Sequence, residues 1–360
     1  MTVSNATASS VQLTTAASFS LERELTGIVG HEAREWFKTI VEVWICSILS
    51  ALGVATNVLV IAVFTRQRFR DNISISMTTI AVWDFLKCVS GVLCRLYWAM
   101  GLEDPVLGEM WLEVSAILLS YLHSFMGFVS CALAAYVSME RCLCVSMPFK
   151  VKDIFTRRLT LIMMITISIL VMSSFMVIFP LWEIKQVFDL DRNASTTILA
   201  FSDFHSDFGV PVLRYYNIIS VLWPLLSFIV IVVSAGVILY NLQKSSKFRG
   251  KNENMQKDGM SKRDLQVVKM LIVIIAVYIV NLFPRIAQYF ARFFEPQFYL
   301  RMRYHNLFIV VITIVFIFDF VNASTNLFIF ISMSTNFRNT FVEMFGGWWI
   351  VIDMKASLPN

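Results

Sequence analysis

The sequence predicts an all-α membrane protein: a bundle of seven transmembrane helices followed by a short amphipathic surface helix. First, 57% of its residues are hydrophobic and only 15% are charged, whereas soluble proteins average about 25% charged residues. Second, seven apolar segments each approach the roughly 20 residues that a helix needs to cross a bilayer. Third, basic residues gather in alternate connections between these segments, a pattern typical of multi-pass membrane proteins.

Each apolar segment is expected to be a helix, because a chain in lipid must satisfy its backbone hydrogen bonds within the segment. The segments cover residues 40–64, 74–99, 112–145, 159–182, 212–240, 266–291 and 304–333. The third is interrupted by Ser120, His123 and Ser124, but it is too long to be a loop.

The connections after the first, third and fifth segments are the basic ones. They contain Arg66, Arg68, Arg70, Lys150, Lys152, Arg157 and Arg158, and then Lys244, Lys247, Arg249, Lys251, Lys257, Lys262 and Arg263. The positive-inside rule places these connections in the cytoplasm and the N-terminus outside the cell. The glycosylation sequons at Asn5 and Asn193 then both lie on the extracellular side. We expect a multi-pass protein of the plasma membrane.

Three regions follow from this organisation. Residues 1–38 are expected to form an extracellular tail, 39–335 the helix bundle, and 336–360 a surface helix with a short cytoplasmic tail. In the last region Phe337, Phe341 and Phe345 recur every four residues, which gives a short helix one apolar face. Such a helix is expected to lie along the cytoplasmic membrane surface.

Ionisable residues inside spans are costly in lipid, so they indicate functional positions. They are Asp84, Lys87, His123, Arg285 and Asp319. Lys87 and Asp319 are expected to meet as a buried pair, whereas Arg285 has no comparably obvious internal partner.

Several motifs occur in the order found in one receptor family. The stretch "ERCLCVSMP", which begins at Glu140, resembles the Asp/Glu-Arg-Tyr motif that ends the third helix of rhodopsin-like G-protein-coupled receptors. The first-helix Asn, the second-helix Asp and the prolines of the fifth and sixth helices are matched by Asn57, Asp84, Pro224 and Pro284. The resemblance covers roughly residues 40–345. Within that family the chain is most similar to molluscan-type invertebrate chemosensory or neuropeptide receptors.

The resemblance implies a switch at the cytoplasmic ends of the helices. Arg141 is expected to pair with Glu140 and, across the bundle, with Asp264, or else Asp264 is a solvated charge. Pro148 and Phe149 would contact a heterotrimeric G protein. Asn326 and Phe330 stand where the family has Asn-Pro-x-x-Tyr, so the Pro and the Tyr of that motif are missing.

The resemblance also implies an allosteric sodium site. Its ligands would be Asp84, Ser130, Asn322 and Asn326, whose oxygen atoms suit a hard cation. The alternative is a hydrogen-bonded network without an ion. Apart from this ion no cofactor is expected.

The implied ligand pocket is cationic. His123 occupies the third-helix position at which amine receptors carry Asp, so a biogenic amine is not favoured. Arg285 would face the pocket, and the other ligand-binding residues are expected to be Lys87, Asp319, Arg95, Arg214 and Gln288. This favours a ligand with a carboxylate or another electron-rich group, either a peptide or a small acidic chemosensory molecule.

Other classes fit the sequence less well. The family's extracellular disulfide is missing: Ala116 replaces one cysteine, and residues 183–211 contain none. No catalytic motif is present, so an enzyme is not expected, and the net charge of +5 does not indicate a nucleic-acid partner. The rival function is an ion-coupled transporter that uses Lys87 and Asp319. Arrestin binding stays open.

Overall fold

Seven helical spans form the molecule. The computed structural model describes residues 28–69, 71–147, 155–189, 194–251, 262–299 and 302–346. Within these ranges seven helical segments are long and apolar enough to cross a membrane. They are His31–Arg66, Asn72–Glu103, Pro105–Ser146, Arg157–Leu181, Asp203–Asn241, Ile272–Phe294 and His305–Met333. The predicted seven-helix bundle is therefore confirmed.

The spans are built from the following elements. The first consists of α2 (His31–Phe37), the π-helix η1 (Lys38–Ile45) and α3 (Cys46–Arg66). The second consists of α4 (Asn72–Cys94) and α5 (Leu96–Glu103). The others are α6 (Pro105–Ser146), α8 (Arg157–Phe175) with the 3-10 helix η2 (Met176–Leu181), α9 (Asp203–Lys251), α10 (Lys262–Phe294) and α11 (His305–Met333). Outside the spans are β1 (Trp182–Asp189), β2 (Ala194–Phe201) and α12 (Thr335–Phe345).

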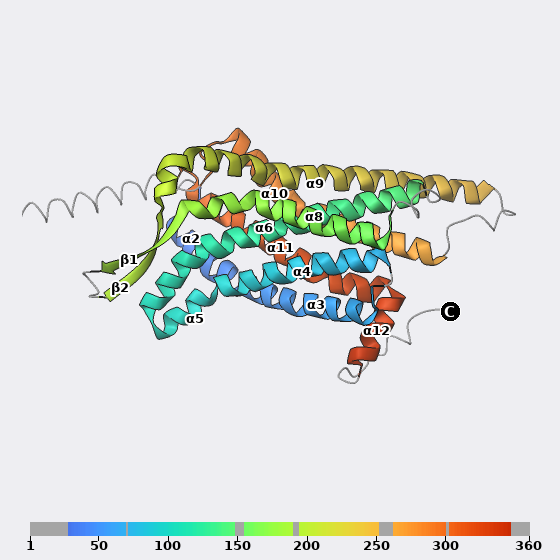
Figure 1. Ribbon diagram of the computed structural model, residues 1–360, viewed down its shortest axis with the longest axis horizontal. Coiled ribbons are helices and arrows are strands. Elements are labelled where there is room, and N and C mark those ends of the chain that lie inside the picture. The colour runs from blue at the N-terminus through green and yellow to red at the C-terminus, as the bar shows by residue number, and fades with distance from the viewer. Residues whose placement is uncertain are drawn as a thin grey trace, which may run out of the picture.

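The spans lie side by side along the longest axis of the molecule (Figure 1). The β1–β2 hairpin projects at the left of Figure 1, which we call the hairpin end, and α12 lies at the opposite, α12 end. Helix α6 packs against α4, α5, α8, α9 and α10. The central position of α6 brings its polar residues close to those of several other helices.

The second and third spans differ from the expected segments. Helix α4 ends at Cys94, and α5 continues the span to Glu103, four residues past the expected end at residue 99. Only Asp104 separates α5 from α6, which begins at Pro105 rather than at residue 112. The Asp104 side chain accepts a hydrogen bond from the Val106 backbone amide at 2.9 Å. An Asp cap followed by Pro is a strong helix start, and this local signal extends the third helix.

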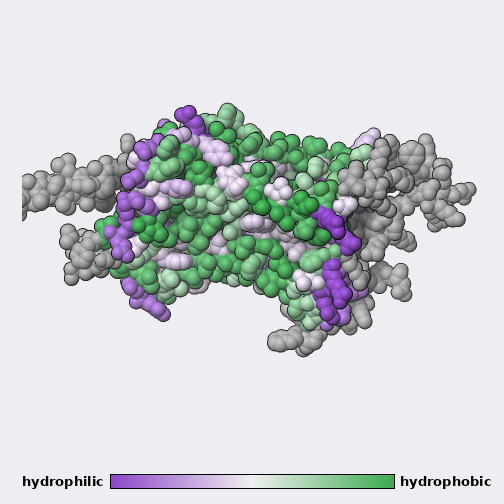
Figure 2. Space-filling model, viewed as in Figure 1, coloured by the Kyte–Doolittle hydropathy of each residue, from purple (hydrophilic) through white to green (hydrophobic). Residues whose placement is uncertain are grey.

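The outer surface is apolar and the interior contains polar groups, as expected for a bundle in lipid. In Figure 2 hydrophobic residues cover the middle of the face shown, and hydrophilic residues gather towards its two ends. Large apolar side chains such as Ile169 (64% exposed) and Phe283 (65%) point outwards. Asn57, Ser76 and Asp84 are fully buried. A soluble protein rarely exposes so extensive an apolar surface.

The two-stranded sheet is an addition to the expected all-helical fold. β1 and β2 are antiparallel, and Trp182 lies opposite Phe201 in the register. The rings of Trp182 and Phe201 stack with centroids 4.6 Å apart, and Phe201 stacks on His205 at 3.9 Å. All six cysteines lie in the described ranges and none forms a disulfide. The aromatic stack therefore holds the base of the hairpin without a covalent link.

Helix α12 follows directly after the last span. The Ser334 side chain caps it by accepting a hydrogen bond from the Phe337 amide at 3.3 Å. Phe337 is 1% exposed, and its ring contacts those of Phe64 and Phe330 at centroid distances of 5.1 and 5.3 Å. The helix expected from the phenylalanine spacing is confirmed, and one of its phenylalanines docks it onto α3 and α11.

Candidate functional site

A buried carboxylate on α4 organises one polar cluster, the Asp84 cluster, which consists of Asp84, Lys87, Ser130 and Asn326. Lys87 Nζ lies 2.7 Å from Asp84 Oδ1, to which Ser130 Oγ donates a second hydrogen bond at 2.9 Å. Asn326 Nδ2 donates to Asp84 Oδ2 at 3.4 Å. Helices α4, α6 and α11 each contribute to the cluster, so it ties three spans together in the interior.

A second buried ion pair joins α10 to α11. Arg285 donates to Asp319 Oδ2, and the two side chains are 8% and 14% exposed. His123 Nε2 lies 3.7 Å from the same oxygen, and its Nδ1 lies 3.3 Å from the Lys87 carbonyl. This geometry corrects two expectations. Asp319 pairs with Arg285 rather than with Lys87, and Arg285 therefore has an internal partner.

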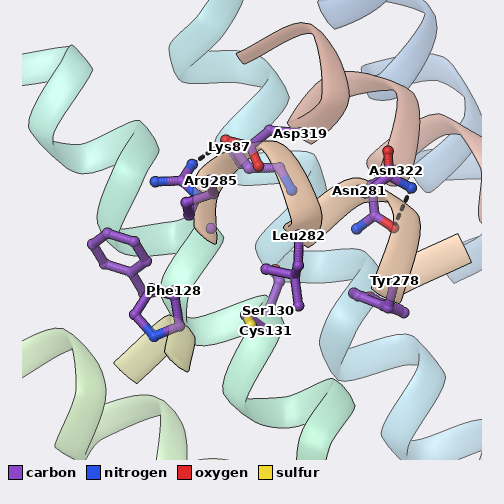
Figure 3. A pocket seen from close by; sticks show the side chains of 12 residues that line it. Lys87, Phe128, Ser130, Cys131, Tyr278, Asn281, Leu282, Arg285, Asp319 and Asn322 are labelled. Carbon is purple, nitrogen blue, oxygen red and sulfur yellow. Dashed lines mark hydrogen bonds and ion pairs between the residues drawn. The ribbon is translucent and has the colours of Figure 1, made fainter. Parts of the chain in front are cut away.

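A small cavity is bordered by Lys87 of the first ion pair and by both residues of the second. It measures about 20 Å³, and we call it the central cavity. Figure 3 shows its lining residues, with Arg285 pointing to Asp319 and with Asn281 bonded to Asn322. Its walls comprise Lys87, Gly127, Phe128, Ser130, Cys131, Pro224, Tyr278, Asn281, Leu282, Arg285, Asp319 and Asn322. A cavity of this size has room for about one water molecule, so a larger ligand requires the helices to separate.

The residues expected to hold sodium do not fit that ion as they are arranged. Asp84, Ser130 and Asn326 do meet, but the negative charge of Asp84 is already paired with the Lys87 ammonium. Asn322 Oδ1 accepts a hydrogen bond from Asn281 at 3.5 Å instead of facing Asp84. Hard cations bind through oxygen lone pairs, whereas here hydrogen-bond donors from Lys87, Ser130 and Asn326 occupy those of the carboxylate.

A second cavity, not anticipated from the sequence, lies nearer the hairpin end. It measures about 70 Å³, and we call it the side cavity. Arg95 lines it and donates to the backbone carbonyls of Glu42 and Gly91, at 2.7 Å each. The other lining residues are Cys94, Tyr97, Leu112, Ser115, Ser120, His123, Phe316 and Phe320. The side cavity shares His123 with the Arg285–Asp319 pair. These residues come from four different spans and form no sequence motif.

Arg214 and Gln288, both expected to bind ligand, line neither of these cavities. Arg214 borders an outer groove on α9 together with Asn217. Gln288 borders an apolar groove between α10 and α11. Of the residues expected to bind ligand, the structure therefore brings together Lys87, His123, Arg285 and Asp319. It places Arg95 in the side cavity. Arg214 and Gln288 lie apart from both cavities.

The α12 end contains the expected Glu140–Arg141 pair. Arg141 donates to Glu140 Oε1 at 2.5 Å, and Asn72 Nδ2 donates to the same oxygen at 3.4 Å. Glu140 is 1% exposed, and its Oε2 has no hydrogen-bond partner among the described residues. Phe330 is also buried.

Several expected residues lie outside the described part of the chain, namely Asn5, Asn193, Pro148 and Phe149, together with the side chain of Asp264. The pairing of Arg141 with Asp264 stays a prediction.

Comparison with known proteins identifies one family. The model of the serpentine type 7TM GPCR chemoreceptor Srw family matches residues 44–348, which include nearly all of the seven spans. A search of curated proteins found no match.

Proposed function

Because the chain belongs to the Srw family of serpentine seven-transmembrane G-protein-coupled chemoreceptors, we propose that it binds a small chemosensory molecule at the hairpin end and activates a heterotrimeric G protein at the α12 end. The hairpin end would then be extracellular and the α12 end cytoplasmic, in the plasma membrane. The basic connections support this orientation. A neuropeptide is the alternative ligand class.

One observation carries the ligand proposal: the Arg285–Asp319 pair lies on the wall of the central cavity. The pair is a discrete connection between α10 and α11 that a ligand can break. A ligand carboxylate or another strong acceptor would replace Asp319 as the partner of Arg285 and release Asp319. His123, 3.7 Å away, then becomes the nearest donor for the released carboxylate. Ligand binding would thereby favour a second arrangement of the two helices.

Helices α10 and α11 also connect the cavity to the α12 end. One helical turn from the ion pair towards the α12 end, Asn281 donates a hydrogen bond to Asn322. One turn further in the same direction, Asn326 donates a hydrogen bond to Asp84. Phe330 then packs against Phe64 and Phe337. We propose that movement of α10 relative to α11 is relayed along this series of contacts to Arg141 and to the G-protein surface.

The finer resemblance to rhodopsin-like receptors, and to molluscan-type ones among them, is part of the proposal. The meeting of Asp84, Ser130 and Asn326 supports it, because the resemblance implies that these residues share one site. An ion-coupled transporter that uses Lys87 and Asp319 is not favoured. Each of these residues is neutralised by a different partner, and the chain is a member of a receptor family.

The test is calcium release in cells that express the chain with a promiscuous G-protein α subunit. The cells are challenged with organic acids, amino acids, volatile compounds and a neuropeptide panel. For a small acidic agonist, Arg285→Ala is expected to raise the half-maximal concentration roughly 10- to 100-fold, the cost of one charge-assisted contact. Arg292→Ala, seven residues later on α10, is the matched control: Arg292 contacts Asn217 and Tyr299 outside the lining of the central cavity, so the variant is expected to respond to the ligand like the wild type.

Surface expression of each variant is measured in parallel with an epitope tag. A peptide agonist indifferent to Arg285→Ala would retain the receptor but contradict the proposed ligand site. Ligand-dependent ion flux without G-protein activation would contradict the receptor mechanism itself.

A further inference from the structure

The Asp84 cluster contains its own cation. Lys87 stands three residues after Asp84 on α4, and the two side chains are 2% and 0% exposed. Residues three apart on a helix share one face, so the ammonium reaches the carboxylate without leaving its own helix. The Asp84 carboxylate accepts hydrogen bonds from three donors, namely Lys87, Ser130 and Asn326. The Lys87 ammonium is the charged one.

The charges around the central cavity balance without an added ion. Asp84 and Asp319 carry two negative charges, and Lys87 and Arg285 carry two positive charges. His123 adds a positive charge only if it is protonated. A sodium ion here would leave one uncompensated positive charge in the bundle interior, and unpaired charge is costly at membrane depth.

We propose that Lys87 is a permanent, covalently attached cation that takes the place of an exchangeable sodium ion on Asp84. An exchangeable ion stabilises a protein in proportion to its concentration, whereas a side chain does not depend on the salt outside. The stability of this receptor is therefore independent of sodium. The inference goes beyond the proposed function and requires neither the ligand nor the G protein.

Removal of the ammonium turns the same residues into a sodium site. In Lys87→Met the negative charge of Asp84 is left uncompensated, and the Ser130 hydroxyl and the Asn326 side-chain oxygen can turn towards a bound ion. Lys87 lines the central cavity, so its truncation enlarges a space that already has room for about one water molecule. A negative site built from oxygen atoms suits a hard monovalent cation.

The experiment measures thermal unfolding of the purified full-length receptor in sodium, potassium or N-methylglucamine chloride at equal ionic strength. The wild type is expected to unfold at the same temperature in all three salts. In N-methylglucamine chloride, Lys87→Met is expected to unfold several degrees below the wild type. Sodium, but not potassium, is expected to restore part of this difference in unfolding temperature. Lys185→Met, an exposed Lys→Met change in β1, controls for the substitution and is expected to behave like the wild type.

The double variant Lys87→Met/Asp84→Asn is expected to lose the sodium response. A sodium-specific rise in the wild-type unfolding temperature would overturn the proposal, and so would a folded Lys87→Met variant that ignores sodium. If Lys87→Met does not fold, Asp84→Asn is compared with the double variant. Asp84→Asn leaves a buried ammonium without its carboxylate, so it must be the less stable of the two, and the reverse order would overturn the proposal.

Discussion

Arg285 on α10 and Asp319 on α11 form an ion pair inside the bundle, and His123 on α6 lies 3.7 Å from the same carboxylate oxygen. The pair is the most direct polar link between two spans that line the central cavity. A charge left without its partner at this depth is much more costly than the loss of both charges together. This asymmetry gives the first prediction.

Arg285→Ala and Asp319→Ala are each expected to lower the free energy of unfolding by about 3–5 kcal/mol, because each leaves one buried charge uncompensated. The double variant is expected to lose much less than the sum of the two. Thermal unfolding of the detergent-solubilised receptor measures all three. Additive losses in the double variant would show that the two side chains do not interact.

The second prediction concerns the switch at the α12 end. Glu140→Gln removes the negative charge that holds Arg141 at 2.5 Å and keeps the side-chain shape. We expect ligand-independent signalling to rise several-fold, because the freed Arg141 can turn towards the G protein. Glu343→Gln on α12 makes the same charge change at an exposed position and serves as the control.

Inositol phosphate accumulation without ligand, in cells that co-express the promiscuous G-protein α subunit and normalised to surface expression, is the measurement. Basal signalling equal to that of the wild type would mean that the Glu140–Arg141 pair does not hold the resting state.

The third prediction concerns the stack at the base of the hairpin. Phe201→Ala removes the ring between Trp182 and His205, and aromatic pairs contribute about 0.5–1.5 kcal/mol each beyond burial. Amide hydrogen exchange in β1 and β2 is expected to accelerate roughly 2- to 10-fold. Ile184→Ala changes an exposed residue of β1 and is expected to have little effect. Unchanged exchange in Phe201→Ala would mean that other contacts hold the hairpin.

The fourth prediction concerns the contact between α5 and α6. A Cβ atom at Gly108 would lie 2.6 Å from the Gly101 Cα, which is backbone and cannot rotate away. Gly108→Ala is therefore expected to cost about 1–3 kcal/mol of stability. Gly236→Ala on α9 meets nothing within 4 Å and is expected to be neutral or stabilising by up to about 1 kcal/mol. Equal unfolding temperatures for the two variants would contradict the close packing.

Much of the fold was predictable because lipid imposes simple rules on sequence. A span must be apolar and long, so hydropathy alone located all seven, and the phenylalanine spacing located α12. The earlier start of α6 was also readable, since Asp104 followed by Pro105 is a local helix-start signal. The hairpin was not predicted, because the packing that supports it joins Trp182 to His205 through Phe201, and Trp182 and His205 are 23 residues apart in the sequence.

The pairing of the interior charges was only partly predictable. The spacing of Asp84 and Lys87 places them on one helical face, and this signal was present in the sequence. The choice between Lys87 and Arg285 as the partner of Asp319 depends on how α4, α10 and α11 rotate against one another. The periodicity of the sequence does not determine that rotation. Membership of the receptor family confirmed the general function, whereas the ligand and the roles of individual residues stay proposals.

The two interior ion pairs differ in how they can enter a membrane during synthesis. Asp84 and Lys87 belong to one helix, so α4 leaves the translocation channel with these charges already neutralised by each other. Arg285 and Asp319 belong to consecutive spans, so neither is neutralised until both α10 and α11 have emerged. We therefore expect α10 and α11 to partition into lipid together as a helical hairpin. Helix α10 is then expected to stay at the channel until α11 has been made.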